Sequence, residues 1–390
     1  MSAHWHINQS TDRIVIIGGG PVGSIAALGL AQQGWRVLIL EASEDKAKRW
    51  GYDARTLAIN LGSHRLLTQF GIPSGAHWSP INQVRVTQQY RRVSTNLSAQ
   101  FMQTDVLGHT IIASQLGALL DERLEQNPNI EMRLGSALAQ LSQTDAGVAI
   151  TTQQGEMITA PFVLACDGAQ SPTRNALGLS PNTHDFNQIA MLSRLMHEQP
   201  HHGIAQERFL SNGVLALLPL PDTEEGRHQS SMVWIQKTVQ AEQTLRLSSA
   251  DLLTQINQTF DGSFGVFTNA TDLKHYPIKQ TLSNGYMRQR VALLGNAAHA
   301  LHPIAGQGLN IGIRDVAQLL EQTTQTMDSK TIQAWADQRK RDAQKSALLT
   351  RAMVFGFSTP VIKQMAGVSL FGIEHIHPLK RRFTRYMMGI

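Results

Sequence analysis

The sequence predicts an α/β protein in which a parallel sheet carries an inserted antiparallel sheet and is followed by a helical C-terminus. Three observations lead to this prediction. The chain begins with a strand, a glycine-rich turn, a helix and a second strand. From about Asn187 to Lys237, short strand-like runs alternate with turn residues, which is typical of an antiparallel sheet. From about Ile311 onward the sequence is mostly helical in character.

The composition is that of a folded protein with more than one packed unit. The chain has 390 residues, of which 42% are hydrophobic, and this length suits two or three units. The formal net charge of +5 suits anionic ligands or an anionic membrane surface, and we expect no nucleic-acid partner. Cys166 is the single cysteine, so no intramolecular disulfide can form. Because Met1–Arg13 lacks an apolar signal region and no long apolar run follows, we expect a cytoplasmic protein.

Three segments near the N-terminus predict a βαβ unit. Ile14–Ile17 is a continuous β-branched run, as expected for a strand buried on both faces of a parallel sheet. Val22–Gln33 has the apolar spacing of a helix, and Gly34 follows where a helix ends. Val37–Leu40 is the second strand.

The turn of this unit carries the motif Gly18-x-Gly20-x-x-Gly23. Glycines allow a tight turn and a close approach of backbone N–H groups to a pyrophosphate, and the helix N-terminus adds partial positive charge. Glu41 ends the second strand, about twenty residues on, where an acidic side chain binds ribose hydroxyls. The motif and its context therefore predict a dinucleotide site rather than a glycine-rich turn without a ligand.

A second block follows the buried strand Phe162–Ala165. It reads Asp167-Gly168-x-x-Ser171-x-x-Arg174. An Asp-Gly turn after a strand is often only a turn, so taken alone this block is as consistent with a structural role as with a binding role.

A third block follows the buried strand Val291–Leu294. It begins Gly295-Asn296 and continues through Pro303–Gly308 into a helix that starts near Leu309. Small residues let a ligand approach the backbone, and the helix N-terminus could stabilise negative charge on a reduced ring. The histidines of this block lack the spacing of a metal site, so no metal is expected and hydrogen-bonding roles are favoured over catalytic ones.

The three blocks, in this order and spacing, resemble the class A flavoprotein monooxygenases, the fold group of the hydroxybenzoate hydroxylases. His302–Asp315 (HPIAGQGLNIGIRD) resembles more narrowly the ring hydroxylases of ubiquinone biosynthesis. Asp53–Ala58 (DARTLA) and the pair Gly295-Asn296 look most like the 2-polyprenyl-6-methoxyphenol hydroxylases. A further set of residues in this chain resembles the substrate-domain sheet of that family: Glu207, Arg208, Phe209, Gly213 and Leu217–Pro219.

The resemblance implies a Rossmann-like FAD-binding domain with non-covalent FAD. The glycines of the first motif would cradle the pyrophosphate, Arg55 would reach it, and Gln115 would touch the ribityl chain. Cofactor contacts are implied for Gly18, Gly20, Gly23, Glu41, Arg55, Gln115, Asp167, Gly168, Gly295, Asn296, Gly308, Leu309 and Asn310. The catalytic loop beside the flavin ring would include Pro303, Gly306 and Gln307.

One position departs from the wider class, which has Gly-Asp where this chain has Gly295-Asn296. Asparagine can still hydrogen-bond a ribityl hydroxyl, but it removes a charge beside the phosphates. We therefore expect this departure to affect the affinity for FAD.

The expected domains are discontinuous. Residues 1–75, 100–182 and 283–345 form the FAD-binding domain, residues 76–99 and 183–282 the substrate domain, and residues 346–390 a C-terminal helical region. Lys380-Arg381-Arg382 follows apolar helical stretches, which suits either a solvated chain end or a peripheral contact with the inner face of the membrane. A homo-oligomer and contacts with other ubiquinone-biosynthesis proteins stay open.

The function implied by the resemblance is hydroxylation of a polyprenylated phenol in ubiquinone biosynthesis, with 2-polyprenyl-6-methoxyphenol as the expected substrate. NAD(P)H would reduce the flavin and O2 would supply the oxygen atom; no second glycine motif is found, so NAD(P)H would bind transiently. The alternatives are another ring hydroxylation of the same pathway, a prenyl reductase, an epoxidase, a flavin halogenase, or a non-catalytic flavoprotein scaffold of the biosynthetic complex. The halogenase motif Trp-x-Trp-x-x-Pro is missing from the sequence, and an intact Pro303–Gly308 loop argues against the scaffold.

Overall fold

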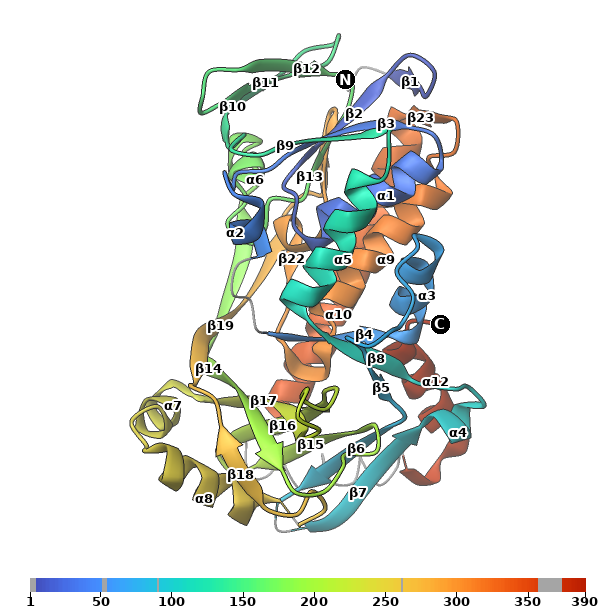
Figure 1. The fold of residues 1–390 in the computed structure, drawn as a ribbon. Helices are drawn as coiled ribbons and strands as arrows, with labels where there is room; N and C mark the ends of the chain where they lie inside the picture. The colour runs from blue at the N-terminus through green and yellow to red at the C-terminus, as the bar shows by residue number, and fades with distance from the viewer. Residues whose placement is uncertain (1–4, 51–54, 90, 261, 357–373) are drawn as a thin grey trace.

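A computed structural model describes residues 5–50, 55–89, 91–260, 262–356 and 374–390 of the chain. Figure 1 shows a parallel sheet at one end of the molecule and a larger sheet at the other, with helices packed beside each. The described α-helices are α1 (Pro21–Gln32), α2 (Lys46–Trp50), α3 (Leu61–Gln69), α4 (Ala99–Met102), α5 (Ala113–Glu125), α6 (Pro172–Ala176), α7 (Thr238–Thr244), α8 (Ser249–Thr259), α9 (Gly308–Glu321), α10 (Ser329–Gly356) and α12 (His377–Met388).

The parallel sheet has six strands in the order β20-β21-β13-β2-β3-β9. All neighbours are parallel except β20 and β21. The strands are β2 (Arg13–Ile17), β3 (Arg36–Leu40), β9 (Ile130–Arg133), β13 (Val163–Ala165), β20 (Met287–Arg288) and β21 (Val291–Leu293). The predicted strand–helix–strand unit at the N-terminus is confirmed by β2, α1 and β3.

The strand register explains why three distant sequence blocks meet. Ala165 at the end of β13 pairs with Ile17 of β2 on one side and with Leu293 of β21 on the other. The carboxyl ends of these three parallel strands therefore lie side by side. Each of the three sequence blocks begins directly after one of these strands, so all three leave the sheet at the same edge, where ligands bind in open α/β sheets.

The larger sheet has nine strands. Eight follow the order β22-β19-β14-β17-β16-β15-β6-β7, and β18 pairs with β14. All pairs are antiparallel except β15 and β6. The strands are β6 (Gln83–Gln88), β7 (Arg91–Ser98), β14 (Pro181–His197), β15 (Ile204–Leu210), β16 (Gly213–Pro219), β17 (His228–Lys237), β18 (Phe267–Ala270), β19 (Lys274–Ser283) and β22 (His299–Ala300).

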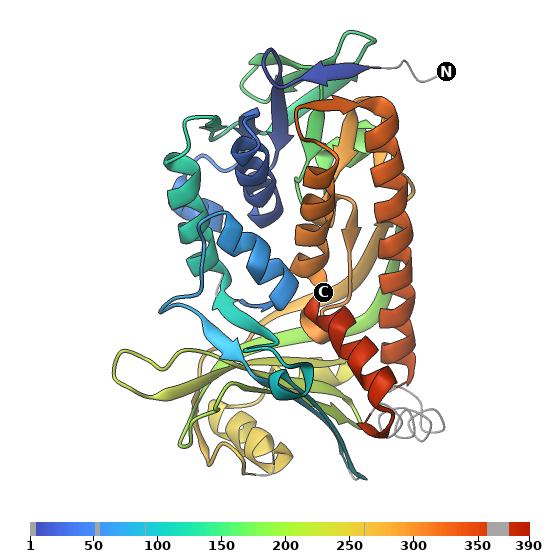
Figure 2. The same ribbon diagram turned by 90° about the vertical axis from the view of Figure 1, so that its right-hand side faces the viewer.

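The two faces of the larger sheet have different neighbours because side chains alternate along each strand. One face packs against α7 and α8, where Leu215, Leu217 and Trp234 join a buried cluster with Leu252 and Ile256. The opposite face looks into the cavity described below. Figures 1 and 2 show α7 and α8 on the side of the sheet away from the parallel sheet.

Three smaller sheets complete the described part of the chain. The sheet β4-β8-β5 lies between the two large sheets in Figure 1, and no sequence pattern predicted it. The strands of the small sheets are β1 (His6–Asn8) with β23 (Thr326–Asp328), β4 (Thr56–Asn60), β5 (Ser79–Ile81) and β8 (Gly108–Ile112), and β10 (Leu138–Gln143), β11 (Val148–Thr152) and β12 (Met157–Ala160).

The α/β fold class predicted from the sequence is confirmed, including the second sheet and the helical C-terminus. Figure 2 shows α10 running from the parallel sheet toward the larger one, with α12 beside it. Part of the expected C-terminal region, residues 357–373, lies outside the described residues. Among the helices that the structure describes, none is long and apolar enough to cross a membrane.

Candidate functional site

A cavity of about 1130 Å³ lies where the three blocks leave the parallel sheet. Its wall combines these loops with the inner face of the larger sheet and with residues of α10 and α12. Ligand cavities of this kind are mostly apolar with a few polar groups. The lining residues contributed by the sequence blocks include Gly20, Pro21, Arg55, Gly168, Asn296, Pro303, Gly306, Gln307, Gly308, Leu309 and Asn310.

The first glycine motif is packed against the second block. Gly18 has a φ of +101°, and a Cβ there would lie 2.6 Å from the carbonyl oxygen of Cys166. A Cβ on Gly23 would lie 2.0 Å from the carbonyl oxygen of Gly18. Gly20 differs, because a Cβ there would meet nothing within 4 Å and the residue lines the cavity. Two glycines of the motif thus close the turn, and the third leaves room for a ligand.

Glu41 stands at the end of β3, as the sequence predicted, but its carboxylate turns back to the glycine loop. Its Oε2 accepts a hydrogen bond of 2.6 Å from the backbone N–H of Gly19, and its Oε1 accepts one of 2.9 Å from Ser43. Glu41 is outside the cavity lining. Its contact with a ribose therefore stays a prediction.

The second block uses its polar side chains to hold its own turn. The carboxylate of Asp167 accepts hydrogen bonds from Ser171 Oγ and from the backbone N–H of Thr173. Buried Arg174 donates to the carbonyl oxygen of Ala297, 3.0 Å away, and so ties this turn to the third block. Gly168 is the member that faces the cavity, with a φ of +85° and open space at its Cβ position.

The third block is anchored by a buried carboxylate of α9. Asp315 Oδ2 accepts a hydrogen bond of 3.3 Å from the backbone N–H of Gly295 and lies 2.6 Å from Nε2 of His299. A Cβ on Gly295 would lie 2.8 Å from Cγ2 of Val22. Glycine is therefore needed here for close packing against α1, while the neighbouring Asn296 is exposed at the cavity.

The loop Pro303–Gly308 is held from behind by the buried side chain of Asn310. Its Nδ2 donates to the carbonyl oxygens of Gly306 and Ala58 over 2.8 and 2.7 Å, and its Oδ1 accepts from the backbone N–H of Asn60 over 2.9 Å. The side chain of Gln307 makes no capping hydrogen bond to the start of α9. The N-terminal amides of α9 thus begin at the cavity wall, where their partial positive charge favours an anionic ligand.

His302 is buried in this loop and makes two hydrogen bonds within the protein. Its Nδ1 accepts from the backbone N–H of Ile304 over 3.1 Å, so the neutral ring carries its proton on Nε2, which donates to Oε1 of Gln188 over 2.8 Å. Burial lowers the pKa of His302 to about 4. The ring is therefore neutral near pH 7, in agreement with the hydrogen-bonding role that the sequence favoured.

Four further positions come from the sequence analysis. Arg55 lines the cavity. Gln115 is half-buried on α5 and outside the lining, and its Oε1 has no hydrogen-bond partner among the described residues. Asp53 and Ala54, the first members of the DARTLA block, lie outside the described residues.

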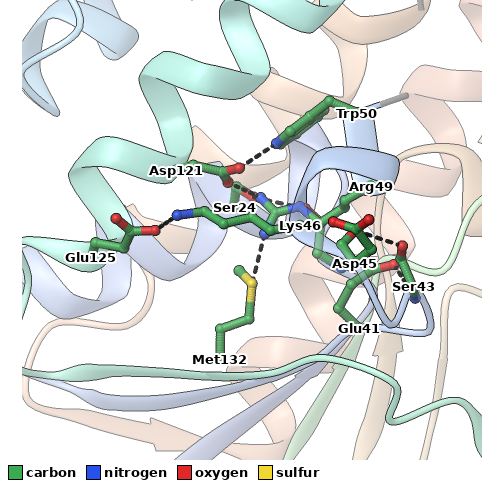
Figure 3. Close-up of polar contacts among 11 residues, drawn as sticks. Ser24, Glu41, Ser43, Asp45, Lys46, Arg49, Trp50, Asp121, Glu125 and Met132 are labelled. Carbon is green, nitrogen blue, oxygen red and sulfur yellow. Dashed lines mark hydrogen bonds and ion pairs between the residues drawn. The ribbon is translucent and has the colours of Figure 1, made fainter. Parts of the chain in front are cut away.

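A buried polar cluster beside the glycine loop was missed by the sequence analysis (Figure 3). Arg49 of α2 forms an ion pair with Asp121 of α5, and Nε1 of Trp50 donates to the same carboxylate over 2.7 Å. Arg49 also donates to Oγ of Ser24 over 3.3 Å, and that hydroxyl donates to the carbonyl oxygen of Gly19 over 2.9 Å. Burial lowers the pKa of Arg49. These residues fasten α2 to the glycine loop, and their wide spacing along the chain left no signal in the sequence.

The C-terminal region was also misjudged in part. Met387 and Met388 of α12 line the cavity, and Gln307 Nε2 donates to the carbonyl oxygen of Met387 over 3.5 Å. Lys380, for which the sequence suggested a solvated end or a membrane contact, is buried and donates to Glu374 over 2.8 Å. Its burial was not visible in the sequence because Glu374 also accepts from the backbone N–H of Asn96, and Nζ of Lys380 lies 5.1 Å from the ring centroid of Phe101. Arg381 and Arg382, the other members of the cluster, are exposed.

The family model described as "FAD binding domain" matches residues 11–347. The chain belongs to this FAD binding domain family. The match spans the glycine motif, the second block and the third block, which are the parts of the chain that meet at the cavity. FAD is therefore the cofactor, as predicted.

The relatives of this family member include two hydroxylases that match along nearly the whole chain. The ubiquinone hydroxylase UbiL of Rhodospirillum rubrum is 29% identical, over 100% of this chain and 92% of that protein. The 3-demethoxyubiquinol 3-hydroxylase of Escherichia coli is also 29% identical, over 98% of this chain and 100% of that protein. The predicted class, a hydroxylating FAD-dependent monooxygenase similar to ubiquinone hydroxylases, is confirmed.

A solved structure supports the fold. The p-nitrophenol 4-monooxygenase PnpA of Pseudomonas putida matches with a TM-score of 0.75 at 19% identity, over 97% of this chain and 98% of that one. The fold of this chain is thus shared with the structure of a monooxygenase.

The cavity wall fits FAD. Gly20, Gly168 and Gly308 each leave open space where a Cβ would stand, and all three line the cavity. The helices α1 and α9 both begin there without a side-chain cap. Open backbone beside two helix N-termini is the arrangement that a pyrophosphate and an anionic ring require.

Proposed function

We propose that this flavoprotein hydroxylates the aromatic ring of a polyprenylated phenol in ubiquinone biosynthesis, with NAD(P)H as a transient electron donor and O2 as co-substrate. The observation that carries the proposal is that the FAD-binding loops and a broad apolar wall belong to a single cavity. An aromatic substrate in that cavity lies in the same enclosed space as the cofactor loops. Proximity of this kind is what an oxygen-transfer reaction needs.

In this proposal the backbone of the three blocks holds the cofactor. The pyrophosphate contacts the glycine motif and Arg55, and the flavin ring lies beside the loop of Pro303, Gly306 and Gln307. Bound FAD supplies the redox and oxygen chemistry. The remaining cofactor contacts are proposed for Gly18, Gly20, Gly23, Glu41, Gln115, Asp167, Gly168, Gly295, Asn296, Gly308, Leu309 and Asn310. Asn310 would also fix the carbonyl group of Gly306, to which its Nδ2 donates over 2.8 Å.

The rest of the wall suits the substrate. Strands of the larger sheet contribute Val84, Leu218 and Ile235, and the C-terminal helices contribute Met353 and Met387. A wall of this kind buries a prenyl chain and excludes water from the reacting ring. Exclusion of water matters because it prevents loss of the reactive oxygen as peroxide.

The substrate that we propose first is 2-polyprenyl-6-methoxyphenol, hydroxylated at the para position. This choice of substrate rests on the resemblance of Asp53–Ala58 and of the pair Gly295-Asn296 to the 2-polyprenyl-6-methoxyphenol hydroxylases. The alternative candidate is another ring hydroxylation of the same pathway. It is supported by the similarity to the 3-demethoxyubiquinol 3-hydroxylase over 98% of the chain. A non-catalytic scaffold has less support, because it has no need for a cavity that joins cofactor loops to an apolar wall.

The test is reconstitution of the purified holoprotein with NADPH, O2 and a prenyl phenol of one isoprene unit. Product and hydrogen peroxide are measured together, and ¹⁸O2 is supplied in a parallel reaction. We expect NADPH consumption coupled to a hydroxylated product that carries ¹⁸O. Peroxide without product across several phenols would exclude the substrate class, and product oxygen derived from water would exclude a monooxygenase. Comparison of a 6-methoxyphenol with a 3-demethoxyquinol analogue distinguishes the two proposed substrates.

A further inference from the structure

One row of side chains crosses the inner face of the larger sheet. The strand register places Val86 of β6 opposite Glu207 of β15, and Glu207 opposite Ala216 of β16. The row continues on both sides, and every member lines the cavity. Its six members are Thr95, Val86, Glu207, Ala216, Val233 and Leu192.

Glu207 is the only carboxylate among the described residues that line the cavity. The neighbours of Glu207 on its own strand show that it faces inward. Gln206 also borders the cavity, but it stands opposite Leu217 of the buried cluster beside α8, and its side chain donates to Ser263 over 2.7 Å. Because side chains alternate along a strand, Ala205, Glu207 and Phe209 share the other face, which lines the cavity. Glu207 therefore points into the same space as the cofactor loops.

The surroundings of Glu207 give it no partner. Its cross-strand neighbours are Val86 and Ala216, and the inward residues two places along its own strand are Ala205 and Phe209. No hydrogen bond or ion pair to its carboxylate is formed by the residues that the structure describes. A carboxylate in an apolar wall is costly unless something in the cavity compensates it.

The same surroundings tune the acidity of this group. Burial raises the pKa of Glu207 to about 7. A carboxylate with such a pKa is present in both protonation states near neutral pH, which suits a group that exchanges a proton with its ligand. Lys279, another ionisable residue of the cavity lining, instead pairs with Asp185 over 3.5 Å.

We propose that Glu207 is a substrate-binding residue whose carboxylate accepts a hydrogen bond from the phenolic hydroxyl and takes its proton during ring hydroxylation. The inference rests on the proposed function, because a phenol is the substrate class that offers such a hydroxyl. The proton moves from the phenol oxygen to the carboxylate, and the electron pair of the broken O–H bond stays on the phenolate. The phenolate ring is more electron-rich and therefore attacks an electrophilic oxygen more readily than the phenol.

The test compares 2-prenylphenol with its methyl ether, which lacks the hydroxyl. Binding of each to the FAD-loaded protein is followed by the change in the flavin spectrum, without turnover, between about pH 5.5 and pH 8.5. Wild-type protein is expected to prefer the phenol, and Glu207→Gln to lose about tenfold of that preference, the size of one hydrogen bond to a charged group. Binding of the ether should change less than about twofold, because it makes no such bond.

Two further variants separate acid–base chemistry from cavity shape. Glu207→Leu keeps the bulk without an acceptor, so the preference for the phenol should disappear. Glu207→Asp keeps an ionisable group, so the pH dependence of phenol binding around neutrality should persist, whereas it should vanish in Glu207→Gln. Bound flavin measures folding in each variant, and Glu224→Gln, an exposed residue of the loop between β16 and β17, is the matched control.

Equal binding of phenol and ether by the wild-type protein would overturn the role of Glu207, as would equal losses for both ligands in Glu207→Gln. A wild-type protein that prefers the phenol through Glu207 but releases only peroxide would support the binding role. That result would instead overturn the proposed hydroxylation, so the two failures are distinguishable.

Discussion

The two walls of the cavity are built from different parts of the chain. The cofactor side is made of backbone, with Gly20, Gly168 and Gly308 leaving open space and two helices beginning there. The opposite side is made of side chains from eight adjacent strands of the larger sheet. A backbone wall suits the phosphate and ring charge of a cofactor, which do not change with the substrate, whereas a side-chain wall can be changed one residue at a time to fit another substrate.

The cofactor side itself contains two kinds of residue, those that face the cavity and those that hold its loops in place. Gly20 and Gly168 face the ligand space directly. Asn310 and Asp167 instead fix the loops through hydrogen bonds within the protein. Substitutions can therefore distinguish loss of the cofactor from loss of the loop that holds it.

The largest effect is expected from Gly20→Val. A side chain at this position meets no protein atom within 4 Å, so the fold should be kept, but it fills the space beside the helix N-terminus where we propose that the pyrophosphate binds. The purified variant should be colourless and folded by circular dichroism. Gly75→Val, at an exposed glycine that also has open space, is the control and should stay yellow. A full flavin spectrum in Gly20→Val would show that this turn does not hold the cofactor.

The next effect is expected from Asn310→Ala. The substitution removes hydrogen bonds to Gly306, Ala58 and Asn60, and leaving these buried groups unpaired should cost about 2 to 4 kcal/mol of unfolding free energy. Chemical denaturation measures this loss, and the ratio of peroxide to product should rise because the loop loosens. Exposed Asn182→Ala is the control. Unchanged stability would mean that these bonds do not hold the loop.

A smaller effect is expected from acid. The pKa of His302 is about 4 in the folded protein against 6.5 when unperturbed, so between these values the unfolded chain binds the extra proton. Stability should therefore fall as the pH drops from about 7 to about 5, by about 2 kcal/mol from this residue. His302→Asn keeps an acceptor for Ile304 and should lose that part of the pH dependence.

Exposed His77→Asn provides the comparison for this acid effect. Denaturation curves at about pH 7 and about pH 5 measure the change in unfolding free energy of each protein. An identical pH dependence in wild-type protein and His302→Asn would mean that His302 is already protonated or accessible in the folded loop.

The smallest effect is expected at the end of α12. Arg381 and Arg382 are exposed, and each basic residue near an anionic membrane contributes about 1 kcal/mol. The double substitution to glutamine should weaken association with anionic vesicles by at most about thirtyfold at low salt and have little effect at high salt. Substitution is preferable to truncation, because Met387 and Met388 line the cavity. Arg65→Gln with Arg246→Gln is the control; equal effects of the two pairs would remove the case for a specific contact.

Much of the cofactor side could be predicted because its signals are local. The Gly18–Gly23 turn, the strand before it and the helix after it are adjacent in the chain, and their spacing is fixed by the geometry of one βαβ unit. The roles of Asp167 and Asn310 were less accessible, since a side chain that can contact a ligand can equally hydrogen-bond its own loop.

By itself, the sequence determined the fold class, the family and the three blocks that meet at the cavity, because glycine spacing and buried β-branched strands have few structural alternatives. The tertiary structure alone decided which side chains share the opposite wall. The inward position of Glu207 depends on the pairing of β15 with β6 and β16, and a shift of one residue would turn it to the other face. The contact of Lys380 with Phe101 and that of Met387 with Gln307 likewise arise only where distant segments meet.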